Sequence, residues 1–187
     1  SWPDTSYQPT KITADIMIGS KKVVGVTFTA TYNTDGNPTA VDANVSVVPY
    51  SMKMSMTDAA TKQTVSAMLK NDNRVVIGAG VALSYADASK EEPNYFDGWF
   101  QLGDIKMSGN ANIGTLSKLD NPKAADFNAN ANLTVTRASD NAKIGDVKAF
   151  DDPDGITPYI VYSDGTKEKA EEYVADLQAK VDELMPK

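Results

Sequence analysis

The run from Asp126 to Arg137 has the pattern that most restricts what this chain can fold into. Phe127, Ala129, Ala131, Leu133 and Val135 alternate with polar residues. A period of two gives an extended chain one apolar and one polar side. We therefore expect a β-strand over residues 126–137, with neighbouring strands at its edges and a second layer over its apolar side.

The same alternation recurs along most of the chain, and turn residues separate the runs. Residues 58–70 are ambiguous: Asp58 suits a helix N-cap, whereas Thr61, Thr64 and Val65 favour a strand, and we interpret the segment as a short helix. The expected strands are 12–18, 23–32, 39–48, 51–56, 74–85, 99–107, a weaker strand or loop at 113–119, and 143–150 and 156–162. The sequence thus predicts a mainly β fold, an antiparallel sandwich or a lipocalin-like barrel of about eight to ten strands.

The C-terminal segment has helical spacing. Thr166 can act as an N-cap, and an apolar stripe follows at steps of three and four residues, formed by Ala170, Val174, Leu177, Val181 and Leu184. We expect residues 166–185 to form one long amphipathic helix that packs on the β layer. The predicted organisation is a polar tether at 1–11, a β domain at 12–165, and this helix as part of the same domain.

Composition excludes several chemistries. The chain has no His and no Cys, which removes the usual general base, thiolate chemistry, disulfides and the ligands of zinc, haem and iron–sulfur centres. The net charge of −7 disfavours nucleic acid as a partner. No apolar run reaches the length of a membrane span. We expect no cofactor.

The opening stretch SWPDTSYQPT is polar, and the chain that follows it is rich in Asn, Asp, Thr and hairpin signals. In this layout the chain resembles the mature part of exported Bacteroidetes lipoproteins. The resemblance implies a location in the periplasm or at the outer membrane and cell surface. It also implies a lipid anchor on a Cys upstream of Ser1.

The densest group of aromatic and acidic residues defines the first candidate ligand site. It comprises Glu91, Glu92, Tyr95, Asp97, Trp99 and Phe100. Aromatic faces beside carboxylates suit a sugar ring, whose hydroxyls donate to the acids. The same acids would serve glycoside hydrolysis if two of them stood at the required separation. The simpler interpretation is that Trp99 and Phe100 begin a strand and pack in the core.

Two further groups are weaker candidates. Met52, Met54 and Met56 lie on one side of an expected strand and would line an apolar pocket with Tyr85, Trp99 and Phe100, or else fill the core. Asp152 and Asp154 fit part of a calcium loop, although Phe150 and Val161 occupy positions where ligands belong.

Asn128, Asn130 and Asn132 form a third group, an amide row on the polar side of the 126–137 run. The row would bind glycans or simply face solvent.

The sequence therefore favours a non-enzymatic exported binding or structural protein. The ligand would be a glycan or a small apolar molecule. A lipocalin-like carrier and a carboxylate-based glycoside hydrolase are the alternatives.

Overall fold

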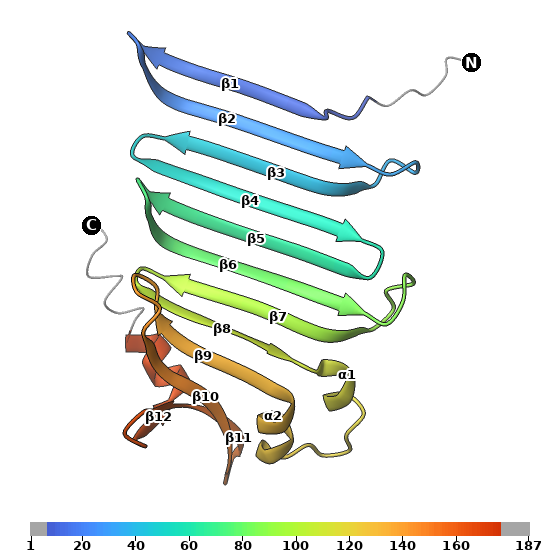
Figure 1. Ribbon diagram of the computed structural model, residues 1–187, viewed down its shortest axis with the longest axis vertical. Helices are drawn as coiled ribbons and strands as arrows, with labels where there is room; N and C mark the ends of the chain where they lie inside the picture. The colour runs from blue at the N-terminus through green and yellow to red at the C-terminus, as the bar shows by residue number, and fades with distance from the viewer. Residues whose placement is uncertain (1–6, 177–187) are drawn as a thin grey trace.

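A computed structural model describes residues 7–176 and shows a single antiparallel sheet of 12 strands in chain order (Figure 1). The strands are β1 (Lys11–Ile18), β2 (Lys21–Tyr32), β3 (Pro38–Val47), β4 (Tyr50–Ala59), β5 (Lys62–Asn71), β6 (Arg74–Tyr85), β7 (Pro93–Leu102), β8 (Ile105–Ala111), β9 (Ala131–Arg137), β10 (Lys143–Asp152), β11 (Gly155–Tyr162) and β12 (Lys167–Lys169). Two short helices, α1 (Ile113–Leu116) and α2 (Ala124–Asn130), lie between β8 and β9. The mainly β, antiparallel prediction is confirmed, including the strands expected at 12–18, 23–32, 39–48, 74–85, 143–150 and 156–162.

The register of the strands gives the sheet two chemically different faces. Val45 in β3 pairs with Val26 in β2 and with Met52 in β4, and Met52 pairs with Leu69 in β5. Directly opposed residues share a face, so each alternating strand adds its apolar residues to the same side. We call this side of β1–β8 the apolar face; its large residues are Ile12, Ile16, Val24, Val26, Phe28, Val41, Val45, Val47, Tyr50, Met52, Met54, Met56, Val65, Leu69, Ile77, Val81, Leu83, Phe96, Phe100, Leu102, Ile105 and Met107.

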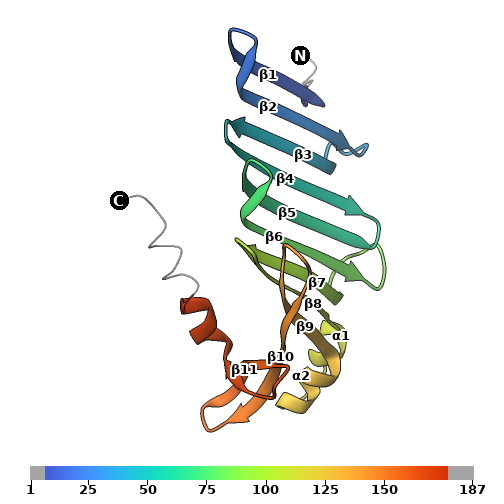
Figure 2. The same cartoon turned by 60° about the vertical axis from the view of Figure 1, so that its left-hand side comes forward.

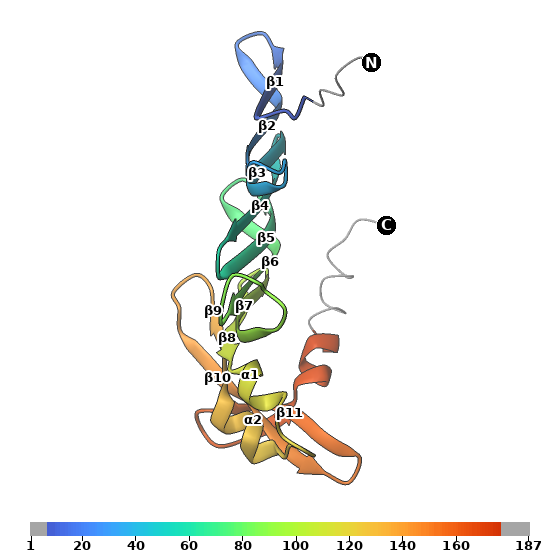
Figure 3. The ribbon, with the colours of Figure 1, turned by 90° about the vertical axis from the view of Figure 1, so that its right-hand side faces the viewer.

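The sheet is open and forms a single layer over most of its width, as the edge view in Figure 3 shows. The expected sandwich and the expected lipocalin-like barrel are therefore both wrong. Within residues 7–176, the buried hydrophobic residues are Ala30, Ala124, Val135 and Ile160, of which only Val135 and Ile160 are fully buried. Alternation predicts that a strand has an apolar side, but it does not supply a layer that covers this side. No helix within residues 7–176 is long and apolar enough to cross a bilayer.

The C-terminal strands leave the plane of the sheet and make the small core that the molecule has. β10 and β11 curl away from the flat part (Figure 2), and α2 lies against β10. Val135 of β9 and Ile160 of β11 have no exposed surface. Gly145 permits this close packing, because a Cβ there would lie 2.9 Å from Ile160 Cγ2 and 2.7 Å from the Val161 carbonyl oxygen.

Residues 58–70 are not helical. β4 continues to Ala59, a tight turn follows, and β5 begins at Lys62. Hydroxyls bond across the pair, Ser55 with Ser66 at 2.7 Å and Thr57 with Thr64 at 2.5 Å. The β-branched and hydroxyl residues that favoured a strand thus prevail over the weak helix signal.

The run 126–137 is only half strand, because α2 occupies residues up to Asn130. Asp126, the third residue of α2, accepts a hydrogen bond from the Lys123 backbone N–H at 2.8 Å and so caps the start of the helix. Asn128 exchanges two hydrogen bonds with the Ala149 backbone, both 2.8 Å long, and so takes the place of a strand partner for β10. The expected row of three Asn side chains on one strand is therefore wrong.

Three other boundaries differ from expectation. Residues 113–116 form α1, with the Asn112 side chain accepting the Thr115 N–H at 3.0 Å. The strand expected at 99–107 is two strands, β7 and β8, separated by a turn in which Gly103 has a φ of 56°. β8 extends beyond the expected end at Met107, to Ala111.

The predicted long helix starts later than expected. Residues 167–169 form β12 against β11, and Thr166 donates to Asp164 in the preceding turn and does not cap a helix. Residues 170–176 are helical, with Ala170 and Tyr173 half-buried and Val174 of the predicted stripe 49% exposed. The remainder of the predicted helix lies outside the described residues.

Candidate functional site

β7 divides the predicted aromatic and acidic cluster between the two faces of the sheet. Asp97 and Trp99 project on the side opposite the apolar face, and Tyr95 has the same parity, whereas Phe96 and Phe100 belong to the apolar face. We call the side that carries Asp97 and Trp99 the polar face. The interpretation of Trp99 as a buried core residue is wrong, because its neighbours leave it half-buried at the surface of an open sheet.

Trp99 rests on the backbone of the neighbouring strand β6. A Cβ added to Gly80 would lie 2.8 Å from Trp99 Cε2, and one added to Gly78 would lie 3.0 Å from the six-membered ring of the same indole. The ring therefore lies along β6 across both glycines, where any side chain would hold it away from the sheet. The group that approaches Gly78 and Gly80 is thus the indole side chain of Trp99.

Polar side chains surround the indole in rows that run across the strands. Trp99 pairs with Ser108, which pairs with Thr134, and on the other side Gly80 pairs with Ser66. In the adjoining row, Asp97 pairs with Asn110, which pairs with Asn132. A hollow of about 240 Å³ is lined by Thr64, Ser66, Asp97, Trp99 and residues of β6.

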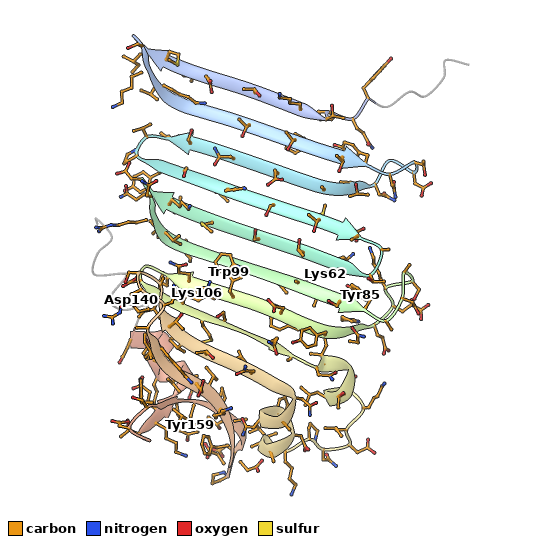
Figure 4. The ribbon with its side chains drawn as sticks, in the orientation of Figure 1. Lys62, Tyr85, Trp99, Lys106, Asp140 and Tyr159 are labelled. Atoms are coloured by element: carbon orange, nitrogen blue, oxygen red, sulfur yellow. The ribbon has the colours of Figure 1, made fainter. Side chains whose placement is uncertain are left out.

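A second, larger hollow lies near one end of the strands. It has a volume of about 750 Å³, and its lining includes Arg74, Gln101, Asp104, Lys106 and Ser139. Figure 4 shows Lys106 between Trp99 and the loop that carries Asp140, and Lys106 Nζ lies 5.7 Å from the centroid of the Trp99 ring. Trp99 thus lines the first hollow, and Lys106, which lies beside its ring, lines the second.

The predicted acids do not come together. Glu91 and Glu92 lie in the loop between β6 and β7 and line a separate hollow of about 260 Å³, together with Lys118. In this loop Lys90 forms an ion pair with Asp58, and its hydrogen bond lowers the pKa of Asp58 below the ordinary value. Asp97 lines the Trp99 hollow with no second carboxylate among the described residues.

The predicted methionine pocket is not enclosed. Met52 and Met54 lie on the apolar face and are 46% and 48% exposed, and Met56 is on the same face. Trp99 is on the other face, so the predicted lining is divided by the sheet itself. Tyr85 donates its hydroxyl to Gln63 Oε1 at 2.7 Å. A shallow hollow of about 250 Å³ lies between Met52, Leu69, Ile77 and Phe100.

The predicted calcium residues stand at the β10–β11 hairpin. Asp152 accepts a hydrogen bond from the Tyr159 hydroxyl at 2.9 Å, and this bond is the main cause of its lowered pKa. Asp154 lies in the turn that follows. No group of three or more acidic residues within residues 7–176 is arranged to hold a metal ion. The calcium site stays a prediction.

Sequence analysis missed Lys106, Ser66 and Asn110 as neighbours of Trp99. Their alternation indicates that each is on the polar side of its strand. Which of them meets Trp99 depends on strand register, and register is set by pairing between strands far apart in sequence.

Searches against protein families, curated proteins and solved structures find no significant match. The function is therefore argued from the geometry of the two faces.

Proposed function

We propose that the protein is a non-enzymatic binding protein whose ligand is a glycan held on the polar face around Trp99. The observation that carries the proposal is the indole lying across Gly78 and Gly80 in the middle of a flat polar surface. An aromatic ring held in place on the surface of a sheet offers a face against which the C–H side of a sugar ring can stack. The polar side chains beside Trp99 then form hydrogen bonds with the hydroxyls at the edge of the sugar ring.

The polar groups around the indole suit hydrogen bonding to sugar hydroxyls. Asp97 is an exposed hydrogen-bond acceptor, while Asn110 and Ser108 supply both donors and acceptors. The 240 Å³ hollow beside Trp99 has the size of about one sugar ring, and the hollow beyond Lys106 provides room for further units. We therefore expect an oligosaccharide to bind better than a monosaccharide.

The alternatives from sequence have less support. A lipocalin-like carrier needs an enclosed interior, whereas the sheet is open and the predicted lining falls on both faces. Glycoside hydrolysis needs two carboxyl groups flanking one bond, whereas Glu91 and Glu92 line a different hollow from Asp97. The exported location expected from the resemblance to lipoproteins is part of the proposal, and cell fractionation tests it.

A glycan array followed by calorimetry on the best ligand tests the proposal. Trp99→Leu removes the aromatic face but keeps apolar bulk, and we expect it to weaken binding by at least about tenfold, since aromatic contacts of this kind contribute about 1 kcal/mol or more. Trp99→Tyr keeps a ring and should retain part of the affinity.

Phe100→Leu is the matched control, because it makes the same kind of change one residue along β7 on the opposite face. It should bind like the unaltered protein. The proposal is wrong if no glycan binds the folded protein, or if Trp99→Leu and Phe100→Leu affect binding equally.

A further inference from the structure

The apolar face is the largest feature of the molecule that glycan binding leaves unexplained. Across its centre, large apolar side chains keep almost half of their surface exposed: Val45 45%, Met52 46%, Met54 48%, Val65 50%, Ile77 43% and Phe100 42%. Single exposed apolar residues are common, but a continuous patch on this scale marks an interaction surface.

The size of the face restricts what can cover it. Eight strands about 4.8 Å apart, with about eight residues each at 3.3 Å, give a surface of about 34 Å by 26 Å, or roughly 900 Å². A stable protein interface needs about 800 Å² from each partner. One α-helix is about 10 Å wide and would cover only about a third of this width. The occupant must therefore be broad and flat.

The charge distribution further restricts what can cover the apolar face. Three charged residues belong to the strand pairs that form the apolar face of β1–β8. Asp58 stands at the end of β4 and is paired with Lys90, whereas Lys21 and Arg74 are the first residues of β2 and β6. The opposite face carries Lys22 with Asp15, and Lys53 with Asp42. Two copies of a chain with a net charge of −7 can thus meet through the centre of this face, where no charged residue lies.

We propose that the apolar face is a homodimer interface, in which two copies pack face to face as the two layers of a β-sandwich. Stacked sheets lie about 10 Å apart and pack with their strands roughly aligned, which a flat apolar surface can do with its own copy. A two-fold axis makes such an interface self-complementary. The hollow of about 250 Å³ between Met52, Leu69, Ile77 and Phe100 gives room for a side chain from the partner.

This arrangement is independent of glycan binding, because it uses the opposite face. It leaves Trp99 and Asp97 exposed on both outer surfaces of the dimer. Two copies of the glycan site would then point in opposite directions.

Light scattering and sedimentation of the full chain test the dimer. We expect twice the chain mass of 20.1 kDa for the unaltered protein. Met54→Lys places a charge near the centre of the face and should raise the dissociation constant by at least about 30-fold. Thr27→Lys adds the same charge on the exposed polar side of β2 and should leave the dimer intact. Circular dichroism checks that both variants fold, which we expect because Met54 is half exposed in the single chain.

Methionine oxidation locates the interface without any substitution. Met52 and Met54 lie on the apolar face, whereas Met68 lies on the polar face and serves as an internal control. Peroxide should oxidise Met52 and Met54 more slowly as protein concentration rises, while the rate at Met68 stays constant. A protein that is monomeric at all concentrations overturns the proposal. So does a dimer in which Met52 and Met54 gain no protection, since that dimer would form through another surface such as the exposed edge strand β1.

Discussion

Trp99 packs against Gly80, so closely that a Cβ on the glycine would stand 2.8 Å from Cε2 of the indole. The contact joins β7 to β6 on the polar face. The absence of a side chain at one position thus sets the orientation of the side chain that carries the proposed function.

Gly80→Ala should move the indole off the sheet. Replacing Gly by Ala in a strand normally raises the free energy of unfolding by about 0.5 to 1 kcal/mol. Here the new methyl group overlaps the Trp99 ring, so we expect the free energy of unfolding to fall by about 1 to 2 kcal/mol. Tryptophan emission in a Trp2→Phe background and urea unfolding measure the two effects. Gly78→Ala touches only the far edge of the ring, at 3.0 Å, and should cost less. Unshifted emission with unchanged stability in Gly80→Ala would contradict the contact.

Gly109→Ala should be more damaging, because the obstacle is backbone. A Cβ at this position in β8 would lie 2.6 Å from Leu133 Cα in β9, and a strand cannot move aside as a flexible side chain can. We expect a loss of about 3 kcal/mol or more in the free energy of unfolding, measured with urea. Ser108→Ala, one residue earlier in the same strand, should change it by less than about 1 kcal/mol. Equal stability of the two variants would show that β8 and β9 are not so close.

Asn128→Ala should weaken the contact between α2 and β10. The substitution removes both hydrogen bonds to the Ala149 backbone and leaves the N–H and the carbonyl of Ala149 without this partner. We therefore expect the free energy of unfolding to fall by about 2 to 3 kcal/mol. Asn130→Ala is the control, since Asn130 donates a single bond to Asp126 O at 3.0 Å and should cost about 1 kcal/mol. Thermal unfolding of the two variants side by side gives the comparison, and the opposite ranking would refute the pairing.

Asp58 should contribute stability that acid removes. Its pKa is lowered in the folded protein, chiefly by the hydrogen bond from Lys90, so the contribution is fully present above the ordinary value of 3.8 and disappears as the pH falls through the lower, folded pKa. Asp58→Asn should therefore destabilise the protein near neutral pH and converge with the unaltered protein in acid. Urea unfolding at several pH values measures this difference.

Asp42→Asn is the matched control for Asp58→Asn. The Asp42 carboxylate lies 3.6 Å from Lys53 on the exposed polar face, where an ion pair contributes little. If the difference in the free energy of unfolding between Asp58→Asn and the unaltered protein stays constant as the pH falls, the ion pair with Lys90 is contradicted.

Strand prediction succeeded where a long alternating run is bounded by turn residues. The run 74–85 corresponds to β6, with Asn71 to Asn73 before it. Prediction failed at residues 126–130, where alanines and asparagines alternate but the segment is helical. Ala is a strong helix former and Asn is disfavoured in strands, so alternation alone misleads here, and the Asn128 bonds to Ala149 hold the helix against β10. That contact spans 21 residues of sequence and cannot be inferred from spacing.

The candidate site was also only partly predictable. Sequence drew attention to Asp97 and Trp99 through their aromatic and acidic character, but it also included Glu91, Glu92 and Phe100, which lie elsewhere. Alternation along β7 already separates Trp99 from Phe100. The meeting of Trp99 with Gly80, Ser108 and Lys106 required the register of three strands.

The sequence by itself determined that the chain forms strands with one apolar and one polar side, because side-chain direction in an extended chain depends only on local backbone geometry. It also excluded thiol and histidine chemistry, since neither residue is present. Tertiary structure alone decided that 12 strands join in order into one open sheet. Closure into a barrel or folding into two layers depends on twist and on contacts between distant segments, which no single strand encodes. For this reason the apolar side, expected from sequence to be a protein core, is an exposed surface in the single chain.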